Sequence, residues 1–235
     1  MENITLSIYV PCYNEEENIT DTLNNIKKGI QNISYEILIV DDGSKDETLE
    51  LANKFKKENL SLNIKIFKNN TNKGIGYNYF STAQKALGKY YMLINGDACD
   101  PHDQIKKIVK NIGKAEIILT YMIDPRGIFR KFLSRLFVLV INLITFKRIK
   151  YYNGTNIHLL DNVKLCEGNS SGFGYQAEII TSLLRKQKTY LEIEINQYKS
   201  KGSSESIALK NIPNVLLSIF RIFVNQIIFL IKKLR

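Results

Sequence analysis

Acidic and amide side chains follow three strand-like runs of this chain, each at the point where the run ends. The first run ends in Pro-Cys-Tyr-Asn-Glu at residues 11–15, the second in Asp-Asp-Gly-Ser at 41–44, and the third in Asn-Gly-Asp at 95–97. In an open α/β sheet, the carboxyl ends of the strands meet at one crevice where ligands bind. Acids that meet there repel one another unless a cation or a hydrogen-bonding ligand is present. The three turns therefore indicate a polar ligand site, unless each Asp merely caps its own turn.

The segments between these turns alternate between strand-like and helical periodicity. Apolar residues at helical spacing predict a helix over residues 19–30, directly after the first turn. Ser44 and Glu47 have the spacing of a capping box and predict the start of a second helix. Such alternation is typical of an α/β fold with a mainly parallel sheet and right-handed crossovers. Further strands are expected at residues 64–67, 90–94, 116–121 and 190–195, with helices between them.

Composition narrows the class of protein. With 235 residues, of which 44% are hydrophobic, the chain can form one α/β domain with a sizeable core plus an appendage. Its three cysteines have neither metal-ligand nor disulfide spacing, and no apolar signal-peptide core opens the chain, so a reducing cytoplasm is expected. His102 and His158 lack a recognisable carboxylate partner and are expected at the surface or in turns.

The chain carries a net charge of +10, which suits a membrane surface or an anionic substrate. No recognisable nucleic-acid-binding motif accompanies this charge, and we therefore expect no nucleic-acid partner.

The first two turns together resemble the opening of the family-2 glycosyltransferases, which begin with Pro-x-Tyr-Asn-Glu and continue into Val-Asp-Asp-Gly-Ser. The resemblance implies a GT-A fold, a Rossmann-like and mainly parallel sheet flanked by helices, over residues 1–205. Residues 206–235 are then expected to form a C-terminal amphipathic helical segment. The resemblance also implies a nucleoside pocket, whose lining residues would be Pro11, Tyr13, Glu15, Asp41 and Asp42.

Two further turns are similar to family positions around the nucleotide. Lys73 lies in an Asn-Lys-Gly turn that matches the turn flanking the nucleotide, although a plain solvated turn is equally compatible. Asn95, Gly96 and Asp97 match the family's Asp-x-Asp metal motif, with Asn95 in place of the first Asp. This match implies Mg²⁺ or Mn²⁺ bound by Asp97 and the Asn95 carbonyl, which would neutralise the diphosphate leaving group. Because Asn supplies no charge, weaker metal binding or binding mainly through Asp97 and phosphate is expected.

The second half of the chain resembles the family's acceptor side. The segment Gly172–Glu178 is similar to a Gly-Phe-x-x-x-x-Glu motif and implies that Glu178 lies near the acceptor. If the acceptor is a sugar hydroxyl, Glu178 or Asp124 is the candidate catalytic base. If it is a phosphate, the nucleophile is already ionised and no strong base is needed. Helix-dipole stabilisation alone would also favour a Glu at this position.

Two cations match positions that hold phosphate groups in enzymes that glycosylate prenyl phosphates. These cations are Arg126 and Lys199. Lys199 replaces an arginine and loses its bidentate geometry, and Glu205 replaces the terminal lysine of the same loop.

Two apolar stretches, Phe132–Phe146 and Val215–Ile231, are both shorter than the ~20 residues that span a bilayer. In the second stretch polar residues gather near one helical face, as in a helix that lies in a membrane interface. Its basic end, Lys232, Lys233 and Arg235, would meet anionic head groups. A helix packed against the core or a partner has the same periodicity. We expect a peripheral enzyme at the inner face of the membrane.

These expectations combine into an inverting glycosyltransferase that uses a nucleoside diphosphate sugar. The expected acceptor is a membrane-borne polyprenyl phosphate, as in the dolichyl-phosphate mannosyltransferase-like branch of the family. Transfer to a sugar hydroxyl of a surface polysaccharide is the first alternative. The second is a nucleotide-sugar-binding protein with little catalysis, because Asn95 and Glu205 depart from the motifs.

Overall fold

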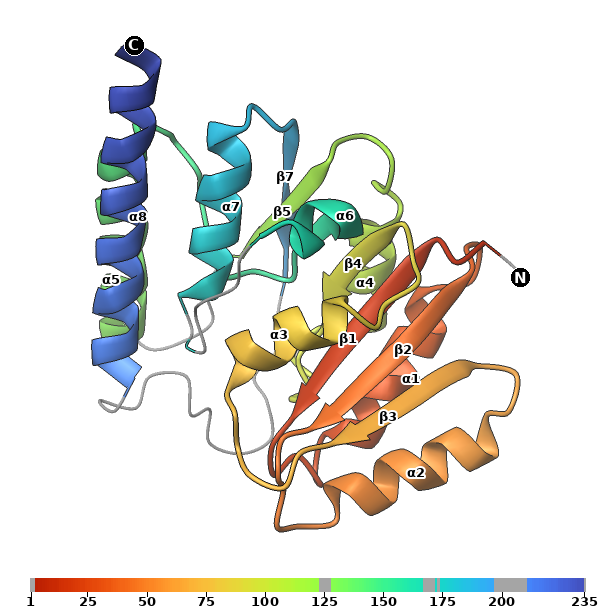
Figure 1. Ribbon diagram of the computed structural model, residues 1–235. Helices are drawn as coiled ribbons and strands as arrows, with labels where there is room; N and C mark the ends of the chain where they lie inside the picture. The colour runs from red at the N-terminus through yellow and green to blue at the C-terminus, as the bar shows by residue number, and fades with distance from the viewer. Residues whose placement is uncertain (1–2, 123–127, 167–171, 173, 197–210, 235) are drawn as a thin grey trace.

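The computed structural model describes residues 3–122, 128–166, 172, 174–196 and 211–234 of the chain. Strands and helices alternate through the first half, as the periodicity predicts (Figure 1). In chain order the elements are β1 (Leu6–Cys12), α1 (Ile19–Gly29), β2 (Tyr35–Asp41), α2 (Thr48–Glu58), β3 (Asn63–Lys68), α3 (Ile75–Ala83), β4 (Tyr90–Leu93), α4 (His102–Val109), β5 (Ile117–Met122), α5 (Ile128–Thr145), β6 (Ile157–Leu159), α6 (Leu160–Lys164), α7 (Tyr175–Arg185), β7 (Tyr190–Ile195) and α8 (Ile212–Leu234).

A seven-stranded sheet in the order β3-β2-β1-β4-β6-β5-β7 forms the centre of the molecule. Strands β3, β2, β1 and β4 are parallel to one another, as are β5 and β7, whereas β6 runs antiparallel to both of its neighbours. The strand order reverses direction between β1 and β4, which is where open α/β sheets bind ligands. The expected α/β architecture is confirmed, and the insertion of β6 explains why the regular alternation ends after β5.

Each strand sends alternate side chains to opposite faces of the sheet, and both faces are covered. Leu6, Ile8 and Val10 of β1 pack with α1, α2 and α4 on one face. Tyr9 lies on the other face, where its ring contacts those of Tyr79 on α3 and Tyr91 on β4. The apolar alternation read from the sequence therefore places β1 in the middle of two cores.

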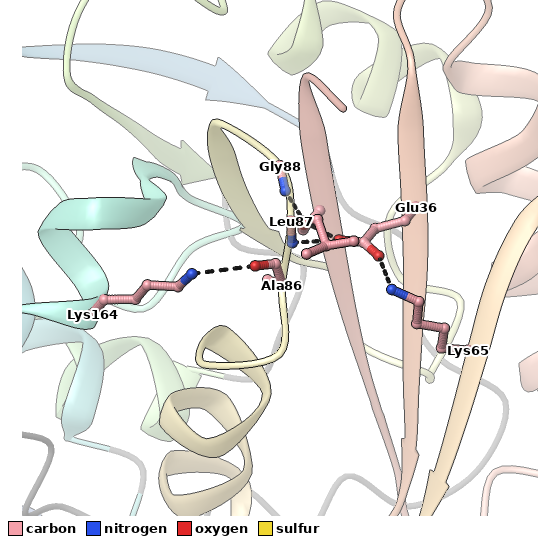
Figure 2. Close-up of polar contacts among 7 residues, drawn as sticks. Glu36, Lys65, Ala86, Leu87, Gly88 and Lys164 are labelled. Atoms are coloured by element: carbon pink, nitrogen blue, oxygen red, sulfur yellow. Dashed lines mark hydrogen bonds and ion pairs between the residues drawn. The ribbon is translucent and has the colours of Figure 1, made fainter. Parts of the chain in front are cut away.

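A buried carboxylate joins the amino-terminal ends of β1 and β2 to the turn before β4 (Figure 2). Glu36 is fully buried, and its Oε1 accepts hydrogen bonds from the Ser7 hydroxyl at 2.6 Å and the Leu87 N–H at 2.7 Å. Its Oε2 pairs with Lys65 Nζ at 2.9 Å. The Gly88 N–H donates to Ser7 Oγ at 2.8 Å, which extends the network. Because both oxygens are satisfied, the buried charge is compensated, and this end of the sheet is fixed opposite the acid-bearing turns.

The predicted capping box at the start of α2 is wrong. The helix begins at Thr48, and Glu47 occupies the cap position without a side-chain hydrogen bond to the helix. The Thr48 N–H donates to Asp46 Oδ1 at 3.1 Å, while the Ser44 hydroxyl accepts a hydrogen bond from the Asn14 N–H at 3.0 Å. Ser44 is thus used to join two loops, a tertiary role that local spacing does not reveal.

Helix α8 is longer than its apolar sequence pattern predicts. It has 23 residues, and within the described part of the chain it is the one helix long and apolar enough to cross a membrane. The expectation that this segment is too short to span is therefore wrong. Length and composition alone do not decide between spanning, lying on a membrane and packing against protein.

In α8, polar residues are buried and large apolar residues are exposed, which is the reverse of an ordinary surface helix. Its buried residues are Ser218, Ile222 and Gln226, whereas Phe220 and Phe223 are about half exposed, at 61% and 48%. The helix packs against α5 and α7 (Figure 1). An outward apolar surface of this kind marks a membrane or protein contact.

His158 is not a surface residue, contrary to the expectation from sequence. It lies in β6, paired with Tyr91 of β4 and Ile117 of β5, and is 1% exposed. Burial lowers the pKa of His158 to about 4. The sequence lacked a signal for this placement because β6 is a three-residue strand with an antiparallel register.

The depressed pKa of His158 predicts acid sensitivity. The His158 side chain takes up a proton near pH 6.5 in the unfolded chain but only near pH 4 in the folded chain. The free energy of unfolding is therefore unaffected by His158 above pH 6.5 and decreases as the pH falls from 6.5 toward 4. The loss should reach about 3 kcal/mol at pH 4. Urea unfolding of wild type and His158→Phe between pH 7.5 and pH 4 would measure it. The variant should show a shallower decline in the free energy of unfolding; parallel declines would contradict the assignment.

Candidate active site

The three turns identified from sequence lie side by side at the carboxyl ends of β1, β2 and β4. The Asp42 N–H donates to the Cys12 carbonyl at 2.8 Å, and the Gly96 N–H donates to the Pro11 carbonyl at 3.2 Å. The end of β1 is therefore hydrogen bonded on one side to the Asp41-Asp42 turn and on the other to the Asn-Gly-Asp turn. This is the convergence that the sequence pattern predicts, although the functional role of each residue stays a prediction.

The loops after β1 and β2 are joined by reciprocal hydrogen bonds. Asn14 adopts a left-handed backbone with φ of 55°, and its side-chain Oδ1 accepts from the Lys45 N–H at 2.9 Å. The Glu15 N–H donates to Thr48 Oγ1 at 2.7 Å, and the Glu16 N–H donates to Asp46 Oδ2 at 3.1 Å. These contacts fix the positions of Tyr13 and Glu15, and the side-chain bond of Asn14 explains the Asn of the first turn.

Asp42 is committed to the turn that precedes α3. Its Oδ1 accepts from the Lys73 N–H and its Oδ2 from the Gly74 N–H, both at 2.9 Å, and Asn69 also donates to Oδ1 at 2.8 Å. Gly74 has a φ of 88°, which suits glycine. The carboxylate therefore holds the Lys73 turn against the end of β2. The place of Asp42 in the nucleoside pocket stays a prediction; the structure shows that Asp42 positions the Lys73 turn.

The two carboxylate oxygens of Asp41 differ in their hydrogen bonding. Oδ1 accepts from the Ser44 N–H at 3.1 Å, whereas Oδ2 is buried without a hydrogen-bond partner among the residues that the structure describes. A buried carboxylate oxygen without a donor is costly and calls for a specific explanation. A donor on a bound ligand would satisfy it, which agrees with the predicted role of Asp41 in the nucleoside pocket.

The acids at these turns act on one another electrostatically. The pKa of Glu15 is raised to about 7, mainly by burial; a hydrogen bond from Asn18 lowers it, and the nearby carboxylates of Asp97 and Asp46 add to the rise. Burial also raises the pKa of the Cys12 thiol, with Glu15, Asp41, Asp46 and Asp97 adding to the effect. Carboxylates from all three strand ends therefore share one region of negative potential, which a cation or a ligand donor would relieve.

The third turn is held tightly against the first. A Cβ on Gly96 would lie 2.8 Å from the Pro11 carbonyl oxygen and 3.1 Å from Cys12 Sγ, so only glycine fits there. Thr22 of α1 donates to the Gly96 carbonyl and accepts from the Ala98 N–H, both at 2.9 Å. The sequence pattern missed Thr22 because its role depends on the packing of α1 under the turn.

Asp97 lines a hollow of about 420 Å³ that lies between α1 and the amino-terminal end of α4, together with Asn18, Asp21 and His102. Its Oδ1 also accepts from the Cys99 N–H at 3.2 Å. No group of three His, Cys, Asp or Glu side chains within the described ranges could hold a metal ion by itself. Magnesium in nucleotide enzymes commonly takes one or two carboxylates and completes its shell with phosphates and water. Asp97 and Asn95 fit that sparse donor set.

Glu178, which is predicted to lie near the acceptor, is in the first turn of α7 and forms an ion pair with Arg221 of α8. Arg221 Nη1 lies 3.9 Å from Glu178 Oε1. The sequence pattern missed Arg221, which falls within an apolar helix far from any motif. The other predicted acceptor residues, Asp124, Arg126 and Lys199, lie outside the described residues.

The pattern of glycosyl transferase family 2 matches residues 7–173, which include all three acid-bearing turns. A dolichyl-phosphate beta-glucosyltransferase from Dictyostelium discoideum is 28% identical over 170 residues, which is 64% of this chain and 52% of that relative. The chain thus spans about half the length of this curated relative.

Solved structures agree on the fold. TarS residues 1–349 from S. aureus, crystallised with UDP, superpose with a TM-score of 0.65 at 19% identity, covering 95% of this chain and 65% of the 1–349 fragment. Glucosyl-3-phosphoglycerate synthase from Mycobacterium tuberculosis, crystallised with Mn²⁺, UDP and glucosyl-3-phosphoglycerate, gives a TM-score of 0.72 at 12% identity, covering 95% of this chain and 80% of the synthase. With the motif turns brought together at the ends of β1, β2 and β4, and with the family pattern matched over most of its length, the chain belongs to glycosyl transferase family 2.

Proposed function

We propose that this chain transfers a sugar from a nucleoside diphosphate sugar to an acceptor, with inversion at the anomeric carbon. The observation that carries the proposal is the junction of the three acid-bearing turns at the point where the strand order reverses. The two solved structures described above contain UDP, which supports a nucleotide ligand for this fold.

Each turn has a proposed part in donor binding. Pro11, Tyr13 and Glu15 line the nucleoside pocket, and the available oxygen of Asp41 accepts a hydrogen bond from the base. The Lys73 turn, held by Asp42, flanks the nucleotide. Mg²⁺ or Mn²⁺, held by Asp97, the Asn95 carbonyl and the donor's diphosphate, would supply positive charge to the leaving group.

A polyprenyl phosphate is the proposed acceptor. The Dictyostelium relative is named for transfer to dolichyl phosphate, and the net charge of +10 suits an anionic substrate. In our proposal Arg126 and Lys199 contact the acceptor phosphate. The likeness to TarS, a poly(ribitol-phosphate) beta-N-acetylglucosaminyltransferase, favours the alternative of a hydroxyl acceptor on a polymer, with Glu178 as the base.

We also propose that α5 and α8 rest on the cytoplasmic face of a membrane. The two helices lie side by side, and they contain no Asp or Glu over residues 128–145 and 212–234 (Figure 1). Exposed cations follow α5 and end α8, which suits anionic lipid head groups. The outward surface, termed the apolar face, comprises Phe132, Leu136, Leu139, Leu143, Leu216, Leu217, Phe220, Phe223, Ile227 and Ile231.

Donor binding and transfer test the proposed activity together. Titration calorimetry with UDP, GDP, dTDP and CDP, with and without Mn²⁺, should find one nucleotide whose binding strengthens in the presence of the cation. Asp97→Ala should abolish the gain from the cation, whereas Glu58→Ala at the exposed end of α2 removes one acid at a distance and should preserve it. If Mn²⁺ still strengthens nucleotide binding in Asp97→Ala, the metal assignment is wrong.

Transfer is then measured with the sugar form of the preferred nucleotide and farnesyl phosphate as acceptor. The proposal predicts a glycosylated farnesyl phosphate in the absence of any glycan. Transfer only to a glycan would establish the hydroxyl alternative, and donor binding without any turnover would establish a binding protein.

Vesicle flotation tests the apolar face. The protein should float with vesicles of phosphatidylglycerol and phosphatidylcholine, because buried aromatic area and anionic head groups both favour binding. Phe220→Glu should weaken binding by about tenfold or more, since it removes a large apolar group from the contact and adds a negative charge. Leu60→Glu, at an 88% exposed position between α2 and β3, is the matched control and should bind normally. Equal loss in both variants would contradict a specific membrane face.

A further inference from the structure

The turn that carries Asp97 contains a backbone conformation that alanine rarely adopts. Ala98, the next residue, has a φ of 55°, which lies in the left-handed region. A residue other than glycine costs free energy there, and it persists where surrounding contacts determine the backbone. Two such contacts are hydrogen bonds, from the Ala98 N–H to Thr22 Oγ1 at 2.9 Å and from the Cys99 N–H to Asp97 Oδ1 at 3.2 Å. The direction of the Asp97 side chain therefore depends on keeping this backbone in place.

The far end of the turn is anchored in the protein interior by Thr155. Both Asp100 and Thr155 are buried, and Thr155 Oγ1 donates to Asp100 Oδ2 at 2.7 Å. Pro101 follows Asp100 directly and occupies the cap position of α4, so the turn passes straight into a helix. Thr22 thus holds the turn at Ala98, and Thr155 holds it two residues later.

Thr155 is itself held in place, because the next side chain, Asn156, reaches three other parts of the fold. Asn156 is buried, and its Oδ1 accepts from the Thr120 N–H of β5 at 2.8 Å. Its Nδ2 donates to the Tyr152 carbonyl at 3.0 Å and to Gln176 Oε1 of α7 at 2.7 Å. Since these groups are buried, moving the segment would leave polar atoms unpaired, which is costly. The turn before α4 is therefore connected, through Thr155, to the rigid frame of β5 and α7.

From these contacts we infer that Thr155 is a positioning residue for the Asp97 carboxylate. The inference rests on the proposed function, in which Asp97, Asn95 and the donor's diphosphate hold Mg²⁺ or Mn²⁺. Thr155 holds Asp100, and Asp100 keeps the left-handed turn in the geometry that orients Asp97. Residues that orient a metal ligand from behind it contribute roughly ten- to hundredfold to metal affinity or activity. A residue of the segment between α5 and β6 thus sets the strength of cation binding at the end of β4.

The test is titration calorimetry with the preferred nucleoside diphosphate, with and without Mn²⁺, and the ratio of the two Kd values is termed the Mn²⁺ gain. Thr155→Val keeps the shape of the side chain and removes its hydroxyl, so the Mn²⁺ gain should fall by about tenfold. The Kd of the nucleotide alone should stay at the wild-type value. Thr155→Ser retains the hydroxyl and should keep most of the gain. An unchanged gain in Thr155→Val, or a loss of nucleotide affinity that is equal with and without the cation, would overturn the inference.

A matched variant separates this role from general support of the fold. Thr145→Val also removes a buried threonine hydroxyl, which donates to the Ile141 carbonyl within α5 at 2.8 Å. It should keep the full Mn²⁺ gain even if thermal unfolding shows a comparable loss of stability; an equal fall in both variants counts against Thr155. If Thr155→Val does not fold, Thr155→Ser and Thr155→Ala decide, because they differ by one hydroxyl. The serine variant should then show the larger gain, and equal gains would refute the inference.

Hydrogen exchange without nucleotide or metal gives a second readout. Peptides covering residues 95–101 should exchange faster in Thr155→Val than in wild type, whereas peptides covering residues 35–41 of β2 should be unaffected. Unchanged exchange over residues 95–101 would show that Thr155 does not position this turn. Failure of the proposed function gives a different result, namely wild-type protein whose nucleotide affinity does not respond to Mn²⁺, and hydrogen exchange then still tests the positioning.

Discussion

The hydrogen bonds from Asp42 to the Cys12 carbonyl and from Gly96 to the Pro11 carbonyl are the contacts on which the proposed site depends. They extend the parallel pairing of β1 beyond its regular end and bring three acidic turns next to one another. Acids gathered in this way repel, and the raised pKa of Glu15 reflects their burial and proximity. At the opposite end of the sheet, the buried Glu36 carboxylate is fully compensated by Ser7, Leu87 and Lys65. The compensated charge and the proposed binding site thus lie at opposite ends of the same strands.

Helix α8 packs on α5 and α7 with one side and exposes large apolar side chains on the other. It directs Ser218, Ile222 and Gln226 inward and large apolar side chains outward, and it places Arg221 beside Glu178. In the proposed arrangement, one side of α8 meets the membrane, while the other side packs against α5 and α7.

Sequence alone could predict the parts of this structure that depend on local pattern. The alternation of Leu6, Ile8 and Val10 correctly predicts a central strand, and the turn motifs correctly predict which strand ends come together. Prediction from sequence failed where tertiary contacts decide the position and hydrogen bonds of a side chain. Ser44 bonds to another loop instead of capping α2, and His158 is buried by an antiparallel strand that periodicity does not show.

The inward face of α8 could not be predicted for a related reason. A helix lying in a membrane interface would turn its polar residues to water, yet Ser218 and Gln226 are buried. Ser218 packs closely on Gly174, which precedes α7. Nothing in residues 212–234 encodes that partner surface. The pairing of Arg221 with Glu178 is likewise a property of two segments that are distant in sequence.

Hydrogen exchange with and without the preferred nucleoside diphosphate and Mn²⁺ tests the central claim most directly, because it reports on each backbone N–H near the site. The account predicts that peptides covering residues 11–17, 41–48, 72–75 and 95–98 gain protection together, including the N–H groups of Lys73 and Gly74 that donate to Asp42. Protection confined to a single turn, or found only along α5 and α8, would contradict a shared donor site at the ends of β1, β2 and β4.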